Sequence, residues 1–405
     1  MKITTFGTPD QGALAQAENC AVEAEKIILM ADNHKGYGMP VGGVAVYKNK
    51  VSPAGVGFDI SCGNKAVRLD VDYDSIKGRL PELAEQIWDN LSFGIGRKNE
   101  TQVSHDLFND QVWQEVDFLR ERPELKSKAE QQLGTIGSGN HYVDVFRDES
   151  NSVWVGVHFG SRGFGHTIAS HFMQLAGDNP NIMDETPHTL SLDTKEGSDY
   201  FMAMELAGRY AYAGRDWVCQ TVADILGGKV IDEVHNHHNY AWKETHFGEE
   251  YVVVRKGATP AFPGQRGFVG STMGGVSVII EGVDSERSKE AFYSAMHGAG
   301  RVMSRTQAAG KWKKLVETRT KPDGTEYQFK RRVRTQGLVD WENVKTELDK
   351  KGIILKGGGA DEAPEAYKDL ESVLKLHKET INILHRLTPL IVCMAGVDEF
   401  DPYKD

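Results

Sequence analysis

Six short apolar runs bounded by glycine-rich segments constrain the fold of this 405-residue chain more than any other feature of its sequence. Apolar residues that alternate or run continuously over a few positions between turn signals indicate β-strands. The strands are predicted at 42–49, 64–73, 141–146, 152–159, 250–257 and 275–283. Because longer helical patterns fall between and after these runs, the sequence predicts a mixed α/β fold.

Three segments have helical patterns, at residues 80–92, 197–225 and 365–387. In the last one Pro364 lies near the expected N-terminus, and Leu370, Val373 and Leu374 partly follow helical spacing. No linker rich in Gly, Ser or Pro divides the chain, so we expect one large domain over residues 1–405.

The cellular compartment is predicted from sequence features that the chain does not contain. The four cysteines are widely spaced and form no CxxC pair, which argues against a disulfide framework or a structural zinc module. The first residues contain no basic segment followed by an apolar run, and no apolar run approaches the length of a membrane span. We therefore expect a cytoplasmic protein with no membrane partner.

A net charge of −11 argues against non-specific coating of nucleic acid. The segment 311–334 is an exception, because it holds nine Lys and Arg residues together with Trp312, Tyr327 and Phe329. Pro322-Asp323-Gly324 inside it is a strong turn signal. Two interpretations fit equally: a basic strip that contacts nucleic acid, or an exposed hairpin whose cations protect its strand edges.

Glycine-rich loops, nearly all at the ends of predicted strands, carry the reactive side chains of this chain. They lie at 32–38, 55–63, 137–141, 158–163, 235–239 and 297–301. Asp59 and Cys62 are spaced so that one turn can present a carboxylate and a thiolate to the same ion, and imidazoles from other loops could complete its shell. Such mixed donors suit Mn, Fe or Zn and do not suit calcium.

The histidine-rich loop cannot supply all of its imidazoles to one ion. In an extended segment His235, His237 and His238 cannot all face the same way, so only some of them are ligands. Asn239 could hold an imidazole, bind phosphate or form an Asx turn.

Phosphate binding is predicted at the last loop. Gly298 and Gly300 would let backbone amides approach a phosphate beside His297, which Arg301 could grip. No Walker A and no dinucleotide-binding motif is present, so nucleotide use does not follow from those patterns. The residues alone predict a transition-metal site, with one ion or several, beside phosphate-binding loops.

Seven segments, in order along nearly the whole chain, resemble the RtcB family of RNA-splicing ligases. They are GVGFDISCG, GSGNH, HFGSRG, HHN, RKGA, HGAGR and DEAPEAYKD. The resemblance implies one α/β domain in which two packed mixed sheets are flanked by helices. It also implies a cleft with two Mn(II) ions, in which Cys62 bridges both, Asp59 and His141 complete one, and His158 and His238 complete the other.

The same resemblance implies the reaction. His297 would attack the α-phosphate of GTP and become guanylylated, and Asp32 would lie near the RNA 5'-hydroxyl. The enzyme would join 3'-phosphate or 2',3'-cyclic phosphate ends of RNA to 5'-hydroxyl ends. The implied contacts to GTP or to the RNA ends are Asn140, Asp144, Arg162, Asn239, Thr272, Gly298, Ala299, Gly300, Arg301 and Tyr367.

The guanine pocket departs from the family pattern at three places. Asp144 stands where the family usually has Glu, and a Gly-Ser-Met turn is replaced by Ser271-Thr272-Met273. Ala395-Gly396 stands in place of a lysine-glycine pair and precedes an acidic tail, 397–405, that contains Glu399 and Asp401. A second hypothesis is a metal-dependent phosphatase or cyclic phosphodiesterase acting on RNA ends, which needs no covalent nucleotide. A third, an inactive RNA-binding scaffold, would require lost ligands, and the set implied above is complete.

Overall fold

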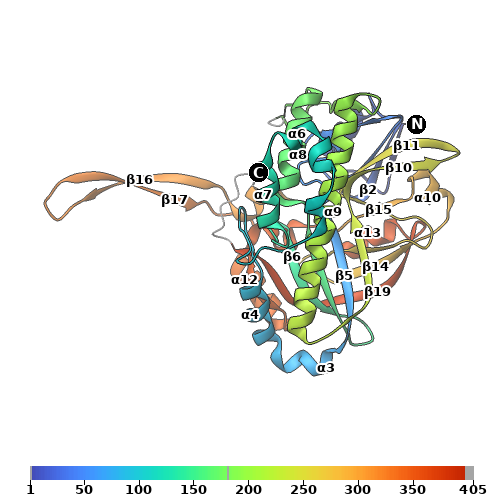
Figure 1. Cartoon of the computed structure of the whole chain (residues 1–405). Coiled ribbons are helices and arrows are strands. Elements are labelled where there is room, and N and C mark those ends of the chain that lie inside the picture. Colours follow the sequence, from blue (N-terminus) through green and yellow to red (C-terminus); the bar gives the residue numbers. More distant parts are fainter. Residues whose placement is uncertain (1, 180–181, 397–405) are drawn as a thin grey trace.

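A computed structural model describes residues 2–179 and 182–396 of the chain. Figure 1 shows a mixed α/β body from which one long hairpin projects. The acidic tail predicted to be distinctive, residues 397–405, lies outside the described residues.

Two sheets form the body. In the described residues the first has five strands in the order β1-β2-β3-β11-β10. Their bounds are Ile3–Thr5, Lys26–His34, Val41–Tyr47, Glu249–Lys256 and Asn239–His246. β1 runs parallel to β2 and the other pairs are antiparallel, so the sheet is mixed.

The second sheet has the order β13-β14-β19-β6-β7-β5-β9, and β18 pairs with β19. Its strands are Arg266–Val269, Ser277–Gly282, Ile381–Gly396, Tyr142–Arg147, Ser152–Phe159, Gly63–Asp72, Val230–His237 and, for β18, Ile354–Gly358. The β18–β19 pair is parallel and the remaining pairs are antiparallel. This sheet is therefore mixed as well.

Helices and short strand pairs complete the description. The α-helices are α1 (Gln11–Cys20), α2 (Pro53–Val56), α3 (Tyr73–Ile76), α4 (Leu80–Asn90), α5 (Val112–Glu115), α6 (Asp117–Arg120), α7 (Pro123–Gln132), α8 (Arg162–Ala176), α9 (Lys195–Leu226), α10 (Glu286–Glu290), α11 (Arg305–Ala309), α12 (Trp341–Lys350) and α13 (Leu370–Leu376). Short 3-10 turns occupy Lys77–Arg79, Asp106–Asn109, Ala360–Glu362 and Pro364–Ala366. The two-stranded pairs are β4 (Lys50–Val51) with β8 (Leu190–Ser191), β12 (Ala258–Pro260) with β15 (Ser294–Met296), and β16 (Trp312–Thr320) with β17 (Glu326–Arg334).

Alternation along the central strands explains why the second sheet is covered on both faces. Val153 and Val155 of β7 point into a cluster shared with Val218 and Val222 of α9. Trp154, between them, points into a different cluster with residues of α12. Because successive strand residues face opposite sides, α9 covers one face and α12 part of the other. Figure 1 shows α9 running along β5.

The two sheets pack against each other through a third cluster. It joins Ile28 of β2, Val44 of β3 and Val253 of β11 to Val278 and Ile280 of β14. The predicted architecture of two packed mixed sheets flanked by helices is therefore confirmed. All six predicted strands are present, as β3, β5, β6, β7, β11 and β14, and the helices predicted at 80–92 and 197–225 are α4 and α9.

The long helix predicted at 365–387 is wrong. The segment contains a 3-10 turn, the short helix α13 and the beginning of β19, a strand that the sequence patterns did not predict. The His377 backbone N–H still bonds to Leu374, but Ile381, Asn382 and Ile383 pair with β14 instead of continuing the helix. Pairing with neighbouring strands overrides the weak helical spacing of this segment.

The hairpin predicted around Pro322-Asp323-Gly324 is confirmed. β16 and β17 are antiparallel, and Gly324 takes a φ of 83° in the turn. No helix in the described part of the chain is both long and apolar enough to cross a membrane.

Candidate active site

A cavity of about 830 Å³ lies at the ends of strands from both sheets. The predicted residues that line it are Asp59, Cys62, Asn140, Asp144, His158, His238, Asn239, Thr272, His297, Gly298, Ala299, Gly300, Arg301 and Tyr367. Loops far apart in the sequence therefore meet at one place, as the strand-end glycine loops predicted.

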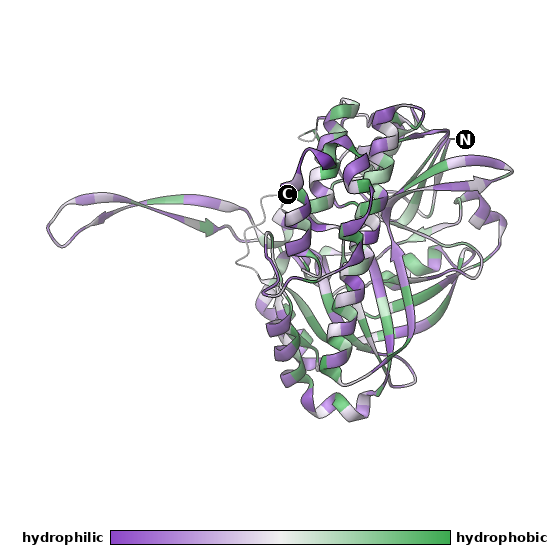
Figure 2. Ribbon diagram, in the orientation of Figure 1, coloured by the Kyte–Doolittle hydropathy of each residue, from purple (hydrophilic) through white to green (hydrophobic). Residues whose placement is uncertain are grey.

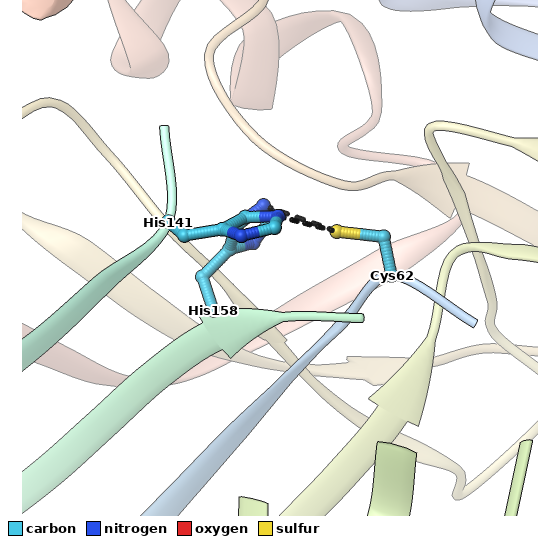
Figure 3. A group of neighbouring side chains, drawn as sticks. All are labelled: Cys62, His141 and His158. Atoms are coloured by element: carbon cyan, nitrogen blue, oxygen red, sulfur yellow. Dashed lines mark hydrogen bonds between the residues drawn. The ribbon is translucent and has the colours of Figure 1, made fainter. Parts of the chain in front are cut away.

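Strand register brings the candidate metal ligands together. Gly63, which follows Cys62, pairs with Phe159 of β7 on one side and with His237 of β9 on the other. These partners are the chain neighbours of His158 and His238. Figure 3 shows the resulting cluster of Cys62, His141 and His158. The Cys62 Sγ lies 3.4 Å from His158 Nε2 and 3.7 Å from His141 Nε2.

Hydrogen bonds fix which nitrogen each imidazole directs into the cluster. His158 Nδ1 lies 2.6 Å from the Asn64 side-chain oxygen, and His141 Nδ1 lies 3.0 Å from the Ile136 carbonyl. Both partners are acceptors, so each Nδ1 donates its proton and the lone pair of each Nε2 is directed into the cluster. His141 Nε2 is 3.0 Å from Asp59 Oδ2. A lone pair facing a carboxylate requires a proton or a cation between them.

The electrostatics of the cluster also fit a cation. Burial lowers the pKa of His158 and of His238 well below the ordinary value, so both are neutral imidazoles. Burial and the neighbouring Asp59 raise the pKa of the Cys62 thiol well above its ordinary value. Burial opposes ionisation of Asp59, but its contacts with His141 bring its pKa down to about 2.

A buried imidazole nitrogen beside this cluster is left without a partner. His238 Nδ1 makes no hydrogen bond to any described residue, and the His238 ring stacks on His158 with ring centroids 5.0 Å apart. An unsatisfied buried nitrogen is costly unless a ligand occupies it. The O, N and S donors gathered here therefore fit a transition metal.

Arg215 of α9 is a residue of this site that the sequence analysis missed. Its guanidinium is fully buried and donates to the carbonyls of Ser61 and Phe159, at 3.0 and 2.6 Å. It also donates to His235 and lies 3.0 Å from His237 Nδ1. The other two histidines of the histidine-rich loop therefore face Arg215, and only His238 faces the metal cluster. The sequence signal that could have indicated its role is the presence of an arginine within the apolar helical pattern 197–225.

His297, which lines the cavity, and the buried Asp32 that contacts it form a second centre of the site. Asp32 is completely buried at the end of β2, and its Oδ2 lies 2.7 Å from His297 Nδ1 and accepts the His297 backbone N–H at 3.0 Å. Burial alone raises the pKa of Asp32, but the charge and hydrogen bonds of His297 hold it below its ordinary value. The ring of His297 is 4.8 Å from that of His238, between centroids. The nucleophile candidate therefore adjoins the metal cluster.

Gly300 permits the close approach of this loop to β2. It takes a φ of 77°, and a Cβ on it would lie 2.0 Å from the Asp32 carbonyl oxygen. No other residue type fits both the backbone conformation and the space. The loop that follows His297 is consequently fixed against the strand that carries Asp32.

Arg301 holds neighbouring protein groups. Its guanidinium donates to Glu362, to the Tyr367 hydroxyl, to the Asp361 carbonyl and to the Met303 carbonyl, at 2.6–3.0 Å. Tyr367 in turn donates to Glu362. This arrangement shapes one wall of the cavity.

Arg162 lies behind His141 and is absent from the lining of the cavity. Its guanidinium approaches His141 Nδ1 at 3.5 Å and donates to Thr135.

Asn239 is fixed by two hydrogen bonds. Its side-chain amide donates to the Asp59 carbonyl and accepts from the Gly257 backbone N–H. Lys256 and Lys368, which the sequence analysis did not single out, both line the cavity.

Comparisons with known proteins agree with this site. The family model described as tRNA-splicing ligase RtcB matches residues 14–395. The chain is 33% identical to the RNA-splicing ligase RtcB of Escherichia coli, over 98% of this chain and 97% of that protein. It is 30% identical to the tRNA-splicing ligase RtcB of Nanoarchaeum equitans, over 94% and 91%, and 28% identical to that of Thermococcus kodakarensis, over 90% and 86%. By the extent of these matches and by its strand-end loops, the chain belongs to the RtcB family.

Proposed function

We propose that this protein is a GTP- and Mn(II)-dependent RNA ligase. It joins RNA 3'-phosphate or 2',3'-cyclic phosphate ends to 5'-hydroxyl ends through a guanylylated His297. The observation that carries the proposal is the Asp32–His297 pair, whose His297 lines the same cavity as Cys62 and His158 of the cluster formed by Cys62, His141 and His158.

Asp32 prepares His297 as a nucleophile. An ionised carboxylate only accepts hydrogen bonds, so Nδ1 of His297 carries the ring proton and Nε2 has the lone pair. In the proposed first step Nε2 attacks the α-phosphate of GTP, an N–P bond forms and pyrophosphate leaves. The developing positive charge on the ring is stabilised by Asp32, in the way that a buried carboxylate stabilises a catalytic imidazolium.

The residues that would hold the metals are Asp59, Cys62, His141, His158 and His238. Divalent cations bound there would neutralise charge on the phosphates and would favour the thiolate form of Cys62. Asn140 and Thr272, both at the cavity wall, are available to orient phosphate oxygens.

The later steps transfer GMP and then displace it. Water first opens a cyclic phosphate to a 3'-phosphate. An oxygen of the 3'-phosphate attacks the guanylyl phosphorus, which breaks the N–P bond and frees His297. The oxygen of the 5'-hydroxyl then attacks the phosphorus of the activated 3'-phosphate and loses its proton to solvent. The phosphodiester bond forms, the P–O bond to GMP breaks and GMP leaves.

Labelling with GTP carrying a radioactive α-phosphate tests the proposal. We expect the wild-type protein to retain label after denaturation, and His297→Ala to retain none. His105→Ala, at a histidine that does not line the cavity, is the control. A protein that hydrolyses RNA end phosphates but never takes up label would instead be the phosphatase or cyclic phosphodiesterase of the second hypothesis.

A further inference from the structure

The surface of the hairpin β16–β17 takes no part in the reaction proposed at His297. Figure 1 shows the hairpin projecting from the body, and Figure 2 shows hydrophilic residues along most of its length. Residues 311–334 hold nine Lys and Arg against three Asp and Glu, in a chain whose net charge is −11. Strands of nine residues reach roughly 30 Å at about 3.3 Å per residue.

Strand register separates the two faces of the hairpin. Directly paired residues share a face, and faces alternate along each strand. Trp312 pairs with Arg334 and Val316 pairs with Lys330, and by alternation Lys314 lies on the same face. The opposite face contains Glu317 with its pair Phe329.

The charges on the two faces are used differently. On the opposite face Glu317 accepts from Arg331 at 2.8 Å and from Arg319 at 3.1 Å, so one carboxylate offsets part of the charge of these two cations. Lys314 and Lys330 are exposed and have no ion pair with any described residue. Trp312 and Val316 lie on either side of Lys314 on this face, and they are 53% and 51% exposed. This face therefore presents unneutralised cations among exposed apolar groups.

The hairpin begins close to the cavity. Val302, Met303, Ser304 and Arg305 line the cavity, and Arg305 begins α11, which leads into β16. At the base, the Thr335 backbone N–H donates to the Lys311 carbonyl, and Arg334 donates to the Gly310 carbonyl. The base of the hairpin therefore follows directly on a segment of the cavity wall.

We propose that the Lys314–Lys330 face of the hairpin binds the sugar-phosphate backbone of the RNA beyond the ends being joined. The proposal rests on the ligase function proposed above and names the part of the substrate that this surface contacts. Phosphates carry the negative charge that free lysines attract, and Trp312 offers a face on which an unpaired base stacks. A local cationic arm also explains how an acidic protein holds RNA.

The double variant Lys314→Ala/Lys330→Ala tests the proposal. Binding of a fluorescent RNA stem-loop with a 3'-phosphate is measured by anisotropy across a series of salt concentrations. Each phosphate contact contributes about 0.7–0.9 to the slope of log K against log salt, so the slope should become less steep by about 1.4–1.8. We expect about tenfold weaker binding of the stem-loop. Binding of a nucleoside 3'-phosphate, which has no further backbone to contact the hairpin, should stay unchanged.

Lys345→Ala/Lys350→Ala on α12 is the matched control, because it removes the same charge from exposed lysines on the body of the protein. A second variant replaces residues 312–334 by two glycines, which the closely paired base of the hairpin can accommodate. It should bind the stem-loop at least as weakly as the lysine variant. GTP labelling of His297 should be unaffected in all of these proteins.

The proposal is overturned if the lysine variant binds the stem-loop with wild-type affinity and salt dependence. It is also overturned if the α12 control loses as much affinity. If the lysine variant self-associates while its RNA binding is unchanged, the lysines only protect the strand edges. If its RNA binding is unchanged and it does not self-associate, the face instead binds an acidic protein. Absent GTP labelling in the wild type would contradict the proposed ligase function, while the RNA-binding result would still decide the role of the hairpin.

Discussion

One carboxylate oxygen of Asp32 contacts His297 twice, at the imidazole Nδ1 and at the backbone N–H. The same oxygen also accepts the backbone N–H of Gly298 at 3.3 Å. Asp32 therefore sets both the ring tautomer of His297 and the path of the loop behind it. Its other oxygen is buried without a partner among the described residues, so the carboxylate is held by this loop.

Asp32→Asn separates the charge of Asp32 from its contacts. An amide oxygen in the place of Oδ2 can keep the contacts with Nδ1 and with the backbone N–H groups, but it carries no negative charge to stabilise the ring when it becomes positive. We expect guanylylation of His297 to slow by at least about 100-fold, the lower end of the contribution of positioned acid–base groups. The measurement is the rate of GTP labelling, with Asp349→Asn on the exposed face of α12 as the control for charge. Labelling within a few-fold of wild type would remove Asp32 from the chemistry.

Cys62→Ala should reduce bound Mn more completely than His141→Ala. The Cys62 sulfur lies near both imidazole nitrogens of the cluster, so as a shared ligand its loss affects two ions, whereas His141 serves one. Metal content is measured after dialysis against buffer with Mn(II). Cys219→Ala, at a buried cysteine in the α9 core, is the matched control. Full Mn occupancy in Cys62→Ala would rule out the bridging role.

Asp144 should give weak discrimination between GTP and ATP. Burial raises the pKa of this carboxyl well above its ordinary value, and Asp144 Oδ1 has no partner among the described residues. A neutral carboxyl both donates and accepts, so it can pair with adenine as well as guanine. We expect ATP to label His297 measurably, and Asp144→Glu to raise the preference for GTP about tenfold, which corresponds to about 1.4 kcal/mol.

Competition between labelled GTP and unlabelled ATP gives that preference directly. Asp144→Asn serves as the comparison, since it keeps the size of the side chain and removes its ionisation. If ATP is never transferred by the wild type, another residue selects the base and the role of Asp144 is different.

His377 should make the protein lose stability in acid. Its Nε2 accepts the Ala31 backbone N–H beside Asp32, and burial lowers its pKa from 6.5 to about 4. Between these values the unfolded chain binds more protons than the folded one, so stability falls as pH falls below about 6.5. The expected loss from this residue between pH 7 and pH 5 is about 2 kcal/mol, from about 1.36 kcal/mol for each pKa unit.

Urea unfolding at the two pH values measures this loss. His377→Phe keeps the stacking on Phe6, whose ring centroid is 4.2 Å away, but cannot titrate. The variant should be less stable at pH 7, because the Ala31 N–H loses its acceptor, and its stability should change less between pH 7 and pH 5. An equal pH dependence in variant and wild type would show that His377 does not contribute to it.

The sequence predicted the strand-end loops well because their residues are close in the chain. Asp59 and Cys62 share one turn, and the strand register alone brings His158 and His238 beside them. The groups that orient these ligands were not predictable in the same way. Asn64 is an ordinary residue within β5 until β7 brings His158 to it, and Arg215 comes from a helix more than 150 residues away from Cys62. Contacts of this kind depend on the tertiary structure.

The wrong helix at 365–387 has the same origin. Its first half has helical spacing and forms α13, whereas the second half has no strong preference and takes the conformation of the strands it meets. Local pattern predicts an element well where it is long and regular, as in α9. It fails where partner strands decide the conformation.

His297→Ala separates nucleotide transfer from strand joining. If His297 only carries GMP, the variant should fail to ligate RNA with ordinary 3'-phosphate and 5'-hydroxyl ends in the presence of GTP. The same variant should still join an RNA whose 3'-phosphate has already been linked to GMP, because the guanylylation steps are bypassed. Cys62→Ala should fail with both substrates, since the metal ligands serve every phosphoryl transfer. One gel that resolves the product lengths makes the comparison. Equal loss by His297→Ala on both substrates would show that His297, only 4.8 Å from the His238 ring, also acts at the joining step.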